Sequence, residues 1–353
     1  MISANDYSLI TDFLADYYDA ELFTRHGVSH PVIQHEPLPA QRDDVDSVLG
    51  RLTPTPPKSP IDDASDFAFY NYAYLHTLQN SGRNLFNGTT YILRLLRTQG
   101  NLRIDAEVGQ YFDMIATCIA LERELLDVIQ AGAIRFPMRS QYHRAVEAQS
   151  SLTRGNGRSA ALGGVVLIVF KDGTQGYKGL VAERSAKNAT RTGALHLIPA
   201  FIFQPQSIDT AKTDWSFKYH IYREYLEELV GMPEDNPAGM ESQPALQDLR
   251  RMEANGTAQI QLTGVSMNLL TLRAEISAVL VIHDANWWED LQTGKRGYQL
   301  ETPESAGELL EIPIGDDELA LSALPNDYYL RMVPQAIPAL WRGIDAARRL
   351  IGE

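Results

Sequence analysis

The sequence predicts an α+β fold, in which strands and helices both contribute to the core. Two apolar runs of strand length, residues 164–170 and 274–282, are rich in β-branched residues and predict buried strands. Apolar residues at helical spacing over residues 107–129 predict a long amphipathic helix. The two kinds of signal in one chain favour the α+β class.

The first half of the chain predicts a mainly helical region with one small hairpin. Further elements are expected as helices at residues 7–17 and 67–78, and as a hairpin formed by residues 90–96 and 102–106. A proline-rich stretch at residues 53–60 is typical of a stiff connector. Residues 150–159, which contain Arg154-Gly155-Asn156-Gly157-Arg158, predict a linker. We therefore expect an N-terminal accessory region at 1–158 and a second domain at 159–353.

Composition limits the classes of function. With 353 residues and 44% hydrophobic residues, the chain can bury one large core or two ordinary ones. A net charge of −14 argues against a nucleic-acid partner, because that affinity comes mostly from Lys and Arg on phosphates. A single cysteine, Cys118, excludes an intramolecular disulfide. No apolar run approaches the ~20 residues of a membrane span, so we expect no membrane partner and a cytoplasmic protein.

Residues 223–228 combine an arginine with three carboxylates on one side of an expected helix. At 100° per residue, Arg223, Glu224, Glu227 and Glu228 lie within an arc of about 140°. Each like-charge pair at i,i+3 or i,i+4 costs an isolated helix roughly 0.2–0.5 kcal/mol. A hard divalent cation would turn that cost into a gain, because Mg²⁺ binds converging carboxylates. The alternative is a solvated acidic face with an Arg223–Glu227 ion pair.

This segment resembles the core of the Nudix box, the helical motif of Nudix hydrolases. Its signature contains Arg-Glu-(apolar)-x-Glu-Glu followed shortly by Gly, which residues 223–228 match, and Gly231 follows one residue later than usual. The upstream Gly and Glu of the family pattern are replaced by Asp209 and Trp215. Ala200 and Phe201 stand where the family has two glycines, so the backbone there must be built differently.

The order of the surrounding elements also resembles a Nudix domain, over about residues 160–353. The resemblance implies an α/β/α sandwich with a mixed sheet. Its opening hairpin would be formed by residues 164–170 and 177–184, with Arg184 at the end of the second strand. A short helix around residues 245–253, a late strand at 308–314 and a closing helix at 333–351 are expected to follow. The chain is also similar to a group of actinobacterial proteins that are often described as transcriptional regulators.

The resemblance implies hydrolysis of a nucleoside-diphosphate-linked or other pyrophosphate-containing small molecule. Glu224, Glu227 and Glu228 would hold Mg²⁺ or Mn²⁺, and Arg223 would orient one carboxylate. Arg184 and His220 are the candidate substrate-binding residues. The alternative is that Arg184 is an ordinary exposed arginine at a strand end and that His220 is a surface histidine. A further carboxylate could come from the acidic region of Glu301, Glu304 and Glu308.

The competing hypothesis is a non-catalytic Nudix-like domain that senses a nucleotide or sugar-nucleotide in a regulatory role. The lost glycines and the missing upstream Glu favour it, whereas the complete Arg-Glu-x-x-Glu-Glu core favours the hydrolase. In both cases the partner is a nucleotide-type small molecule. Three roles stay open for residues 1–158: covering the ligand pocket, forming a homodimer interface, or completing the fold.

Overall fold

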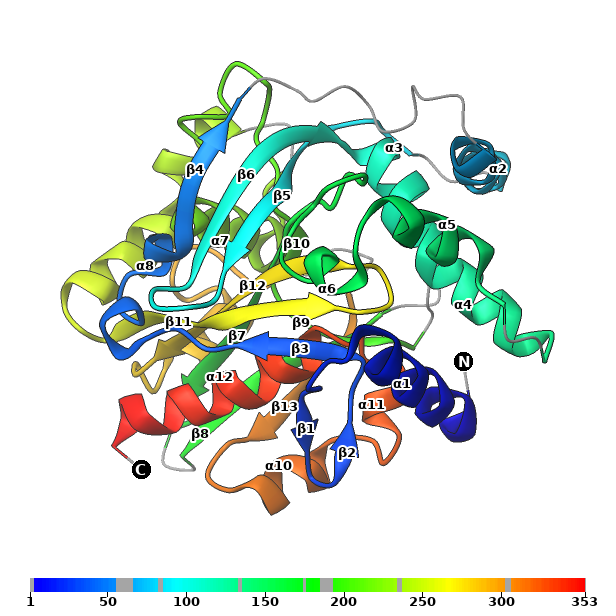
Figure 1. Cartoon of the computed structure of the whole chain (residues 1–353). Coiled ribbons are helices and arrows are strands. Elements are labelled where there is room, and N and C mark those ends of the chain that lie inside the picture. The colour runs from blue at the N-terminus through cyan, green and yellow to red at the C-terminus, as the bar shows by residue number, and fades with distance from the viewer. Residues whose placement is uncertain are drawn as a thin grey trace.

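A mixed sheet forms the centre of the protein in a computed structural model (Figure 1). The structure describes residues 3–54, 66–81, 85–132, 135–173, 176–184, 193–233, 237–301 and 306–352. Within these residues the sheet has eight strands in the order β13-β8-β7-β12-β11-β3, with β10 paired to β7 and β9 paired to β8. The strands are β3 (Val32–His35), β7 (Gly163–Lys171), β8 (Tyr177–Arg184), β9 (Leu195–Leu197), β10 (Ala200–Ile202), β11 (Ala258–Asn268), β12 (Arg273–Ile282) and β13 (Ala306–Pro313). Together with the helices, this sheet confirms the α+β class.

The sheet is buried on both faces, which explains its continuous apolar strands. In β7, Val166, Ile168 and Phe170 point to one face, where they join the larger core cluster. The alternate residues Val165 and Leu167 point to the other face and pack against the C-terminal helix. Strands β7 and β12 are parallel, whereas β12 and β11 are antiparallel, so the sheet is mixed.

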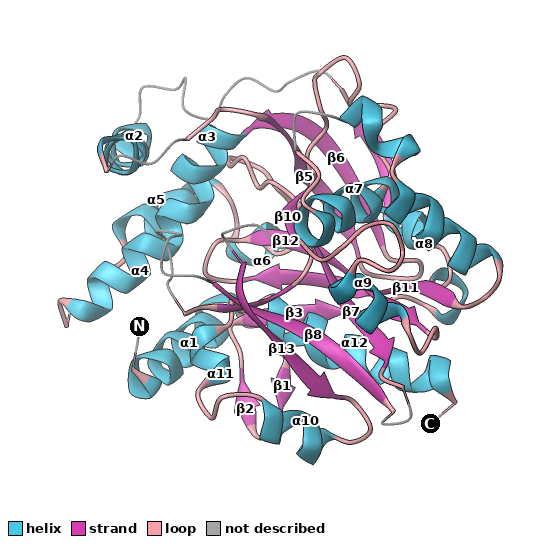
Figure 2. Ribbon diagram, turned by 180° about the vertical axis from the view of Figure 1, so that it is seen from behind, coloured by secondary structure: helices cyan, strands magenta, loops and turns pink. Residues whose placement is uncertain are grey.

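Helices cover both faces of this sheet (Figures 1 and 2). Helix α12 (Ala336–Ile351) packs against β7, β11 and β12 on one face. Helices α7 (Phe217–Val230), α8 (Pro244–Ala254) and α9 (Trp287–Thr293) lie on the other. Trp287 and Trp288 of α9 stack on each other and pack against Phe170, so this aromatic pair closes the core.

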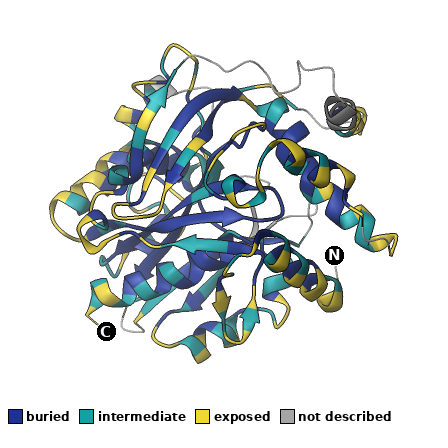
Figure 3. Cartoon of the chain, in the orientation of Figure 1, coloured by how far each residue is buried: buried dark blue, intermediate teal, exposed yellow. Residues whose placement is uncertain are grey.

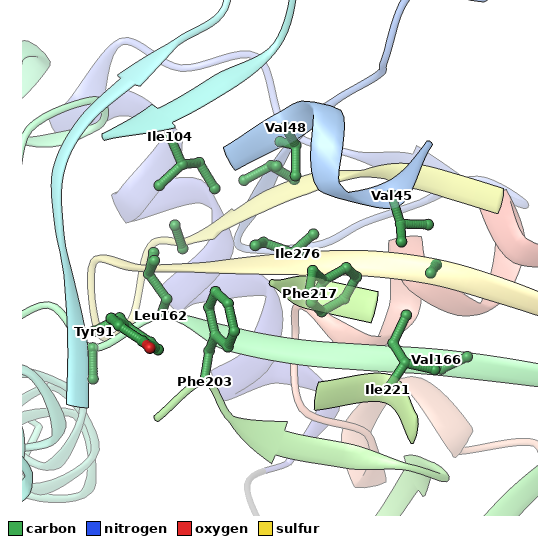
Figure 4. Close-up of a cluster of buried hydrophobic side chains, with 14 of the residues drawn as sticks. Val45, Val48, Tyr91, Ile104, Leu162, Val166, Phe203, Phe217, Ile221 and Ile276 are labelled. Atoms are coloured by element: carbon green, nitrogen blue, oxygen red, sulfur yellow. The ribbon is translucent and has the colours of Figure 1, made fainter. Parts of the chain in front are cut away.

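A second sheet lies on the far side of α7 and comes entirely from the N-terminal region. Its order is β4 (Leu49–Thr53), β6 (Arg103–Gln110) and β5 (Thr89–Arg97), preceded by the 3₁₀ helix η2 (Val45–Val48). The predicted hairpin is confirmed as β5 and β6, and β4 extends it. Figure 4 shows side chains of this layer packed with those of α7 and the central sheet, namely Val45, Val48, Tyr91 and Ile104 with Phe217, Ile221, Val166 and Ile276.

The remaining N-terminal elements are mostly helical, as predicted. Helices α1 (Ala4–Tyr18) and α2 (Asp66–Asn80) confirm two of the expected helices. The third begins later than expected, because β6 continues to Gln110; it runs through α3 (Tyr111–Met114), a π-helical segment (Ile115–Ile119) and α4 (Ala120–Gln130). The other described elements are α5 (Pro137–Ala145), α6 (Ala148–Ser151), α10 (Asp317–Ala323), α11 (Tyr328–Arg331), β1 (Thr24–Arg25), β2 (Val28–Ser29), η1 (Pro39–Gln41) and η4 (Pro237–Ser242).

Residues 150–159 are not the solvated linker that the sequence predicts. The Arg158 side chain is buried and donates hydrogen bonds to the carbonyl oxygens of Ser151 and Leu272 and to the Tyr142 hydroxyl. Residues on both sides of this segment belong to one hydrophobic cluster, and β3 joins the central sheet. Figure 3 shows the dark-blue buried positions continuing across the two parts of the chain. The residues on either side of 158/159 therefore share one core.

The predicted proline-rich connector falls largely outside the described residues, because residues 55–65 are not described. Within the described part of the chain, no helix is both long and apolar enough to cross a bilayer.

Candidate functional site

Helix α7 carries the Nudix-like residues and is capped from both ends. The Ser216 hydroxyl accepts a hydrogen bond from the Tyr219 amide, so Ser216 is the N-cap. The Asp46 carboxylate, from η2, accepts hydrogen bonds from the amides of Phe217 and Lys218. A carboxylate is favourable here, because the first amides of a helix are unpaired and carry partial positive charge. The helix ends at Gly231, which adopts a left-handed conformation (φ 68°).

Arg223 neutralises two of the three glutamates inside the protein. Its Nη2 lies 2.6 Å from Glu224 Oε1, and its Nε lies 3.5 Å from Glu227 Oε1. The side chains of Arg223, Glu224 and Glu227 are only 7%, 10% and 11% exposed. Burial alone would lower the pKa of Arg223, yet the adjacent carboxylates more than offset it and raise that pKa above its ordinary value. The solvated acidic face is therefore ruled out, whereas its Arg223–Glu227 ion pair is present.

Glu228 reaches the loop at which the central sheet splits. Strands β7 and β8 pair only near their shared turn, and beyond it β9 pairs with β8 while β10 pairs with β7. The Ala200 amide at the start of β10 donates a hydrogen bond of 3.3 Å to Glu228 Oε2. This contact ties the C-terminal half of α7 to the segment that follows the cis peptide bond Ile198–Pro199.

The split places Phe201, which stands where the Nudix pattern has a glycine, against a glycine of β7. Phe201 lies directly opposite Gly164 in the β10–β7 pair. A Cβ atom on Gly164 would lie 2.4 Å from the Phe201 ring, so the glycine provides the space that the ring fills. A close approach of the two strands is thus kept, with the small residue on β7 instead of on the loop.

In this arrangement the three glutamates contact protein groups. Glu224 and Glu227 face the Arg223 guanidinium, whose positive charge occupies the position next to their oxygens. Glu228 faces a backbone amide on a neighbouring strand. Among the described residues, no group of three or more His, Cys, Asp or Glu side chains is placed so that it could hold a metal ion. The helical wheel places these side chains on one face but does not predict their partners, because a wheel gives only the direction of a side chain.

His220 is not the surface histidine that the sequence predicts. Its side chain is completely buried, packed against Phe203 and Tyr91, and its Nε2 lies 2.9 Å from the Asp214 carbonyl oxygen. Burial lowers the pKa of His220 well below its ordinary value. The sequence misses this because α7 is covered on both sides, by the central sheet and by the N-terminal layer. His220 is therefore enclosed by rings and cannot contact a phosphate.

The other candidates lie apart from the glutamates or outside the described part. Arg184 is the last residue of β8, as predicted, and its side chain is not described. Glu301 pairs with the end of α7 through its amide and the Leu229 carbonyl oxygen. Glu308 is exposed on β13, and Glu304 lies outside the described residues. Neither Glu301 nor Glu308 belongs to a group of described side chains that could hold a metal ion, as a late catalytic carboxylate would.

A cavity of about 180 Å³ lies at the open end of the split. Its walls come from the start of β7, β9, β10, the start of β12 and the N-terminal end of α12. Ala200, which contacts Glu228, also lines it. The polar lining residues are His196, Arg273, Glu275 and Gln335. The cavity therefore adjoins the Nudix-like helix on one side and a group of polar residues on the other.

Arg273 is the positive group of this cavity. Its Nε donates a hydrogen bond of 2.8 Å to the Ala161 carbonyl oxygen, which fixes the orientation of the guanidinium. The structure gives its two terminal nitrogens no hydrogen-bond partner among the described residues. With one edge fixed in this way, the guanidinium presents its other donors to a ligand.

Glu275 lies beside Arg273 and is held by Gln335. Gln335 Nε2 donates a hydrogen bond of 3.2 Å to Glu275 Oε2. Burial raises the pKa of Glu275 to about 7, an effect that Arg273 and Gln335 only partly counteract. A protonated Glu275 would be a hydrogen-bond donor in the cavity, and near pH 7 both forms are populated. The sequence does not predict Arg273 and Glu275 as site residues, because the apolar pattern of β12 indicates only a buried strand.

His196 also borders the cavity and is held by the backbone. Its Nδ1 lies 2.7 Å from the Leu197 carbonyl oxygen, and the side chain is 9% exposed. His283, another histidine near a strand end, contacts the Tyr177 hydroxyl at 2.8 Å through Nδ1. Both histidines thus have partners within the fold.

Comparison with known proteins adds no family assignment. No family model matches the sequence, and a search of curated proteins finds no significant match.

Proposed function

We propose that this chain is a Nudix-like ligand-binding module that recognises a nucleotide-type small molecule in a regulatory role. The single observation that carries the proposal is the state of the box glutamates. Arg223 lies between Glu224 and Glu227 in a buried cluster, so these carboxylates stabilise the helix and its surroundings. Catalysis through a bound divalent ion would need them to be directed at that ion.

The buried cluster also accounts for the retention of costly like charges. In a site that had lost its metal and stayed solvated, three glutamates on one helical face would only destabilise the helix. Here a buried arginine compensates two of them, and removing it would leave two buried carboxylates without its charge. The complete Arg-Glu-x-x-Glu-Glu core is thus compatible with a module that does no chemistry.

The cavity at the split supplies the chemistry of recognition. Arg273 offers two nitrogens to an anionic group such as a phosphate, and charge-assisted hydrogen bonds of this kind are strong. Gln335 and Glu275 offer further polar contacts, and Val165, Leu195 and Ala336 form apolar walls. An apolar cavity with a few fixed polar groups is typical of small-molecule sites.

A Mg²⁺- or Mn²⁺-dependent hydrolase is the second proposal. The observation that favours it is the weaker of the two contacts of Arg223. The 3.5 Å separation from Glu227 is longer than a hydrogen bond, so the Glu227 carboxylate could turn away at modest cost. This proposal requires turnover that depends on the metal ion and is lost in Glu227→Gln.

Binding and turnover can be measured on the same samples. The full chain is titrated with nucleoside diphosphates and sugar nucleotides in a calorimeter, with and without Mg²⁺, and phosphate release is followed in parallel. We expect binding without turnover, and an affinity reduced about ten- to hundredfold in Arg273→Ala, since a charged hydrogen bond contributes roughly 1.5–3 kcal/mol. Arg123→Ala is the matched control, because Arg123 is exposed on α4 and pairs with Asp127. If Arg273→Ala and Arg123→Ala bind the ligand equally well, the cavity is not the binding site. If phosphate is released in a metal-dependent reaction, the hydrolase is the correct function and the binding module is refuted.

A further inference from the structure

The outer face of the second sheet carries a concentration of arginines that the proposed function does not use. Within the described residues, Arg51 on β4, Arg94 and Arg97 on β5, and Arg103 on β6 share this face with Asp105 and Glu107. Arg154, from the segment after α6, joins them. The sheet that carries this face, β4, β6 and β5, lies at the top of Figure 1. This excess of positive charge contrasts with a chain whose net charge is −14.

The two carboxylates on this face are already committed. Glu107 pairs with Arg94. Asp105 pairs with Arg97, and its Oδ1 also accepts a hydrogen bond of 2.8 Å from the Arg51 amide. The structure gives the side chains of Arg51 and Arg154 no hydrogen bond or ion pair within the described chain. Two uncompensated guanidinium groups therefore remain on one surface.

The register of the strands increases the repulsion between positive charges. Arg97 and Arg103 lie directly opposite each other in the β5–β6 pair. Like charges at such positions destabilise a sheet. An anion bound on this face would relieve the repulsion, which is a physical reason for such a costly arrangement.

The segment that carries Arg154 is fixed against β5 by a close backbone contact. Leu95 and Arg154 form an isolated antiparallel bridge, and the Leu96 amide donates to the Thr153 carbonyl oxygen at 2.7 Å. A Cβ atom on Gly155 would lie 1.8 Å from the Leu93 carbonyl oxygen, so only glycine permits this approach. The glycine-rich stretch that predicts a linker instead holds Arg154 beside the sheet.

A cavity of about 190 Å³ lies between these groups. It is lined by Arg51, Thr53, Arg94, Leu95, Asp105, Ala106, Arg154 and Asn156. We propose that this cavity is a second binding site, which takes a phosphate-bearing small molecule through Arg51, Arg94 and Arg154.

The chemistry of the lining selects the class of ligand. The planar guanidinium fork matches phosphate oxygens, and the Asn156 amide and the Thr53 hydroxyl add hydrogen-bond donors. The described residues that line the cavity include no aromatic ring on which a base could stack, whereas single-stranded nucleic acid is bound by stacking. A phosphate group is therefore favoured over a nucleobase or a nucleic-acid strand.

The test uses inorganic pyrophosphate as the probe, in calorimetric titrations of the full chain without metal ion. The wild type should bind saturably, and the affinity should fall as ionic strength rises. The affinity of the double variant Arg51→Ala/Arg154→Ala for pyrophosphate should be lower by a factor of at least about ten. The control double variant Arg123→Ala/Arg144→Ala removes the same charge from the exposed surfaces of α4 and α5 and should bind like the wild type.

Two further measurements distinguish this site from the cavity at the split and from a purely structural role of the arginines. Arg273→Ala should leave unchanged the pyrophosphate binding that depends on Arg51 and Arg154; if instead it abolishes all binding, the anion occupies the cavity at the split and the proposal fails. Urea unfolding of Arg51→Ala/Arg154→Ala without anion should give at least the wild-type stability, because neither side chain has a partner to lose within the described chain. The proposal is overturned if the wild type shows no saturable binding, if Arg51→Ala/Arg154→Ala binds as tightly as the wild type, or if single-stranded RNA binds more tightly than pyrophosphate and displaces it.

Discussion

Replacement of Arg223 by methionine tests whether the box glutamates are held by an internal ion pair. Methionine keeps most of the length and the apolar contacts of the side chain but removes the charge. Glu224 and Glu227, 10% and 11% exposed, then lose the group 2.6 and 3.5 Å from their oxygens. Breaking a buried pair by removing one partner costs up to about 3–5 kcal/mol, because the other charge stays buried without that partner. We expect Arg223→Met to lower the free energy of unfolding by more than about 1 kcal/mol and by at most that amount.

Urea unfolding followed by circular dichroism gives this value, and a matched control gives its baseline. Arg123→Met breaks an exposed ion pair with Asp127, in which both side chains are about half exposed, so it should cost at most about 1 kcal/mol. Adding Glu224→Gln to Arg223→Met should recover part of the loss, because the carboxylate closest to the missing guanidinium is then neutral. A loss below about 1 kcal/mol in Arg223→Met, or no recovery in the double variant, would refute the buried ion-pair cluster.

Three other perturbations follow from the same structure. Asp46→Ala removes the carboxylate that caps α7 and should lower the free energy of unfolding by about 1–2 kcal/mol, whereas the exposed Asp12→Ala should not. Glu275 has a pKa near 7 in the folded protein, above the ordinary value of 4.5, so its contribution to stability is complete below pH 4.5 and is lost as the pH rises through 7. Glu275→Gln should therefore flatten the fall in stability between pH 5 and pH 8, and an unchanged pH profile would contradict the raised pKa. Gly155→Ala should destabilise the chain and weaken pyrophosphate binding together, because the added methyl group meets the Leu93 carbonyl oxygen; unaltered binding would show that this contact does not position Arg154.

The sequence predicts the elements that have strong local patterns. The hairpin of β7 and β8, strand β12, helix α8 and the C-terminal helix are each confirmed to within a few residues. Continuous β-branched runs and helical spacing determine these elements locally. Strand β11 is not predicted, because its glutamine and serine residues interrupt the apolar pattern, and cross-strand pairing with β12 and β3 stabilises it.

The sequence could not show what lies around the predicted helix α7. The helical wheel correctly places Arg223 and the three glutamates on one face, but the N-terminal layer that covers α7 comes from residues more than a hundred positions earlier. That layer buries His220 and supplies Asp46. Contacts between segments so far apart in sequence leave no local pattern, so the sequence could not predict that the Arg223 ion pairs are buried.

The cavity residues could not be predicted for a related reason. Arg273 and Glu275 lie at the start of a buried strand, and Gln335 precedes the C-terminal helix. Only the parallel pairing of β12 with β7 brings them to the open end of the split.

Titration of the metal-free chain with Mn²⁺, followed by electron paramagnetic resonance, tests most directly whether the box glutamates form an ion-pair cluster or a metal site. We expect no saturable Mn²⁺ binding that depends on Glu227 or Glu228, so the wild type, Glu227→Gln and Glu228→Gln should give the same titration. A saturable site in the wild type that disappears in both variants, together with metal-dependent phosphate release from a nucleoside diphosphate derivative, would contradict the binding-module proposal.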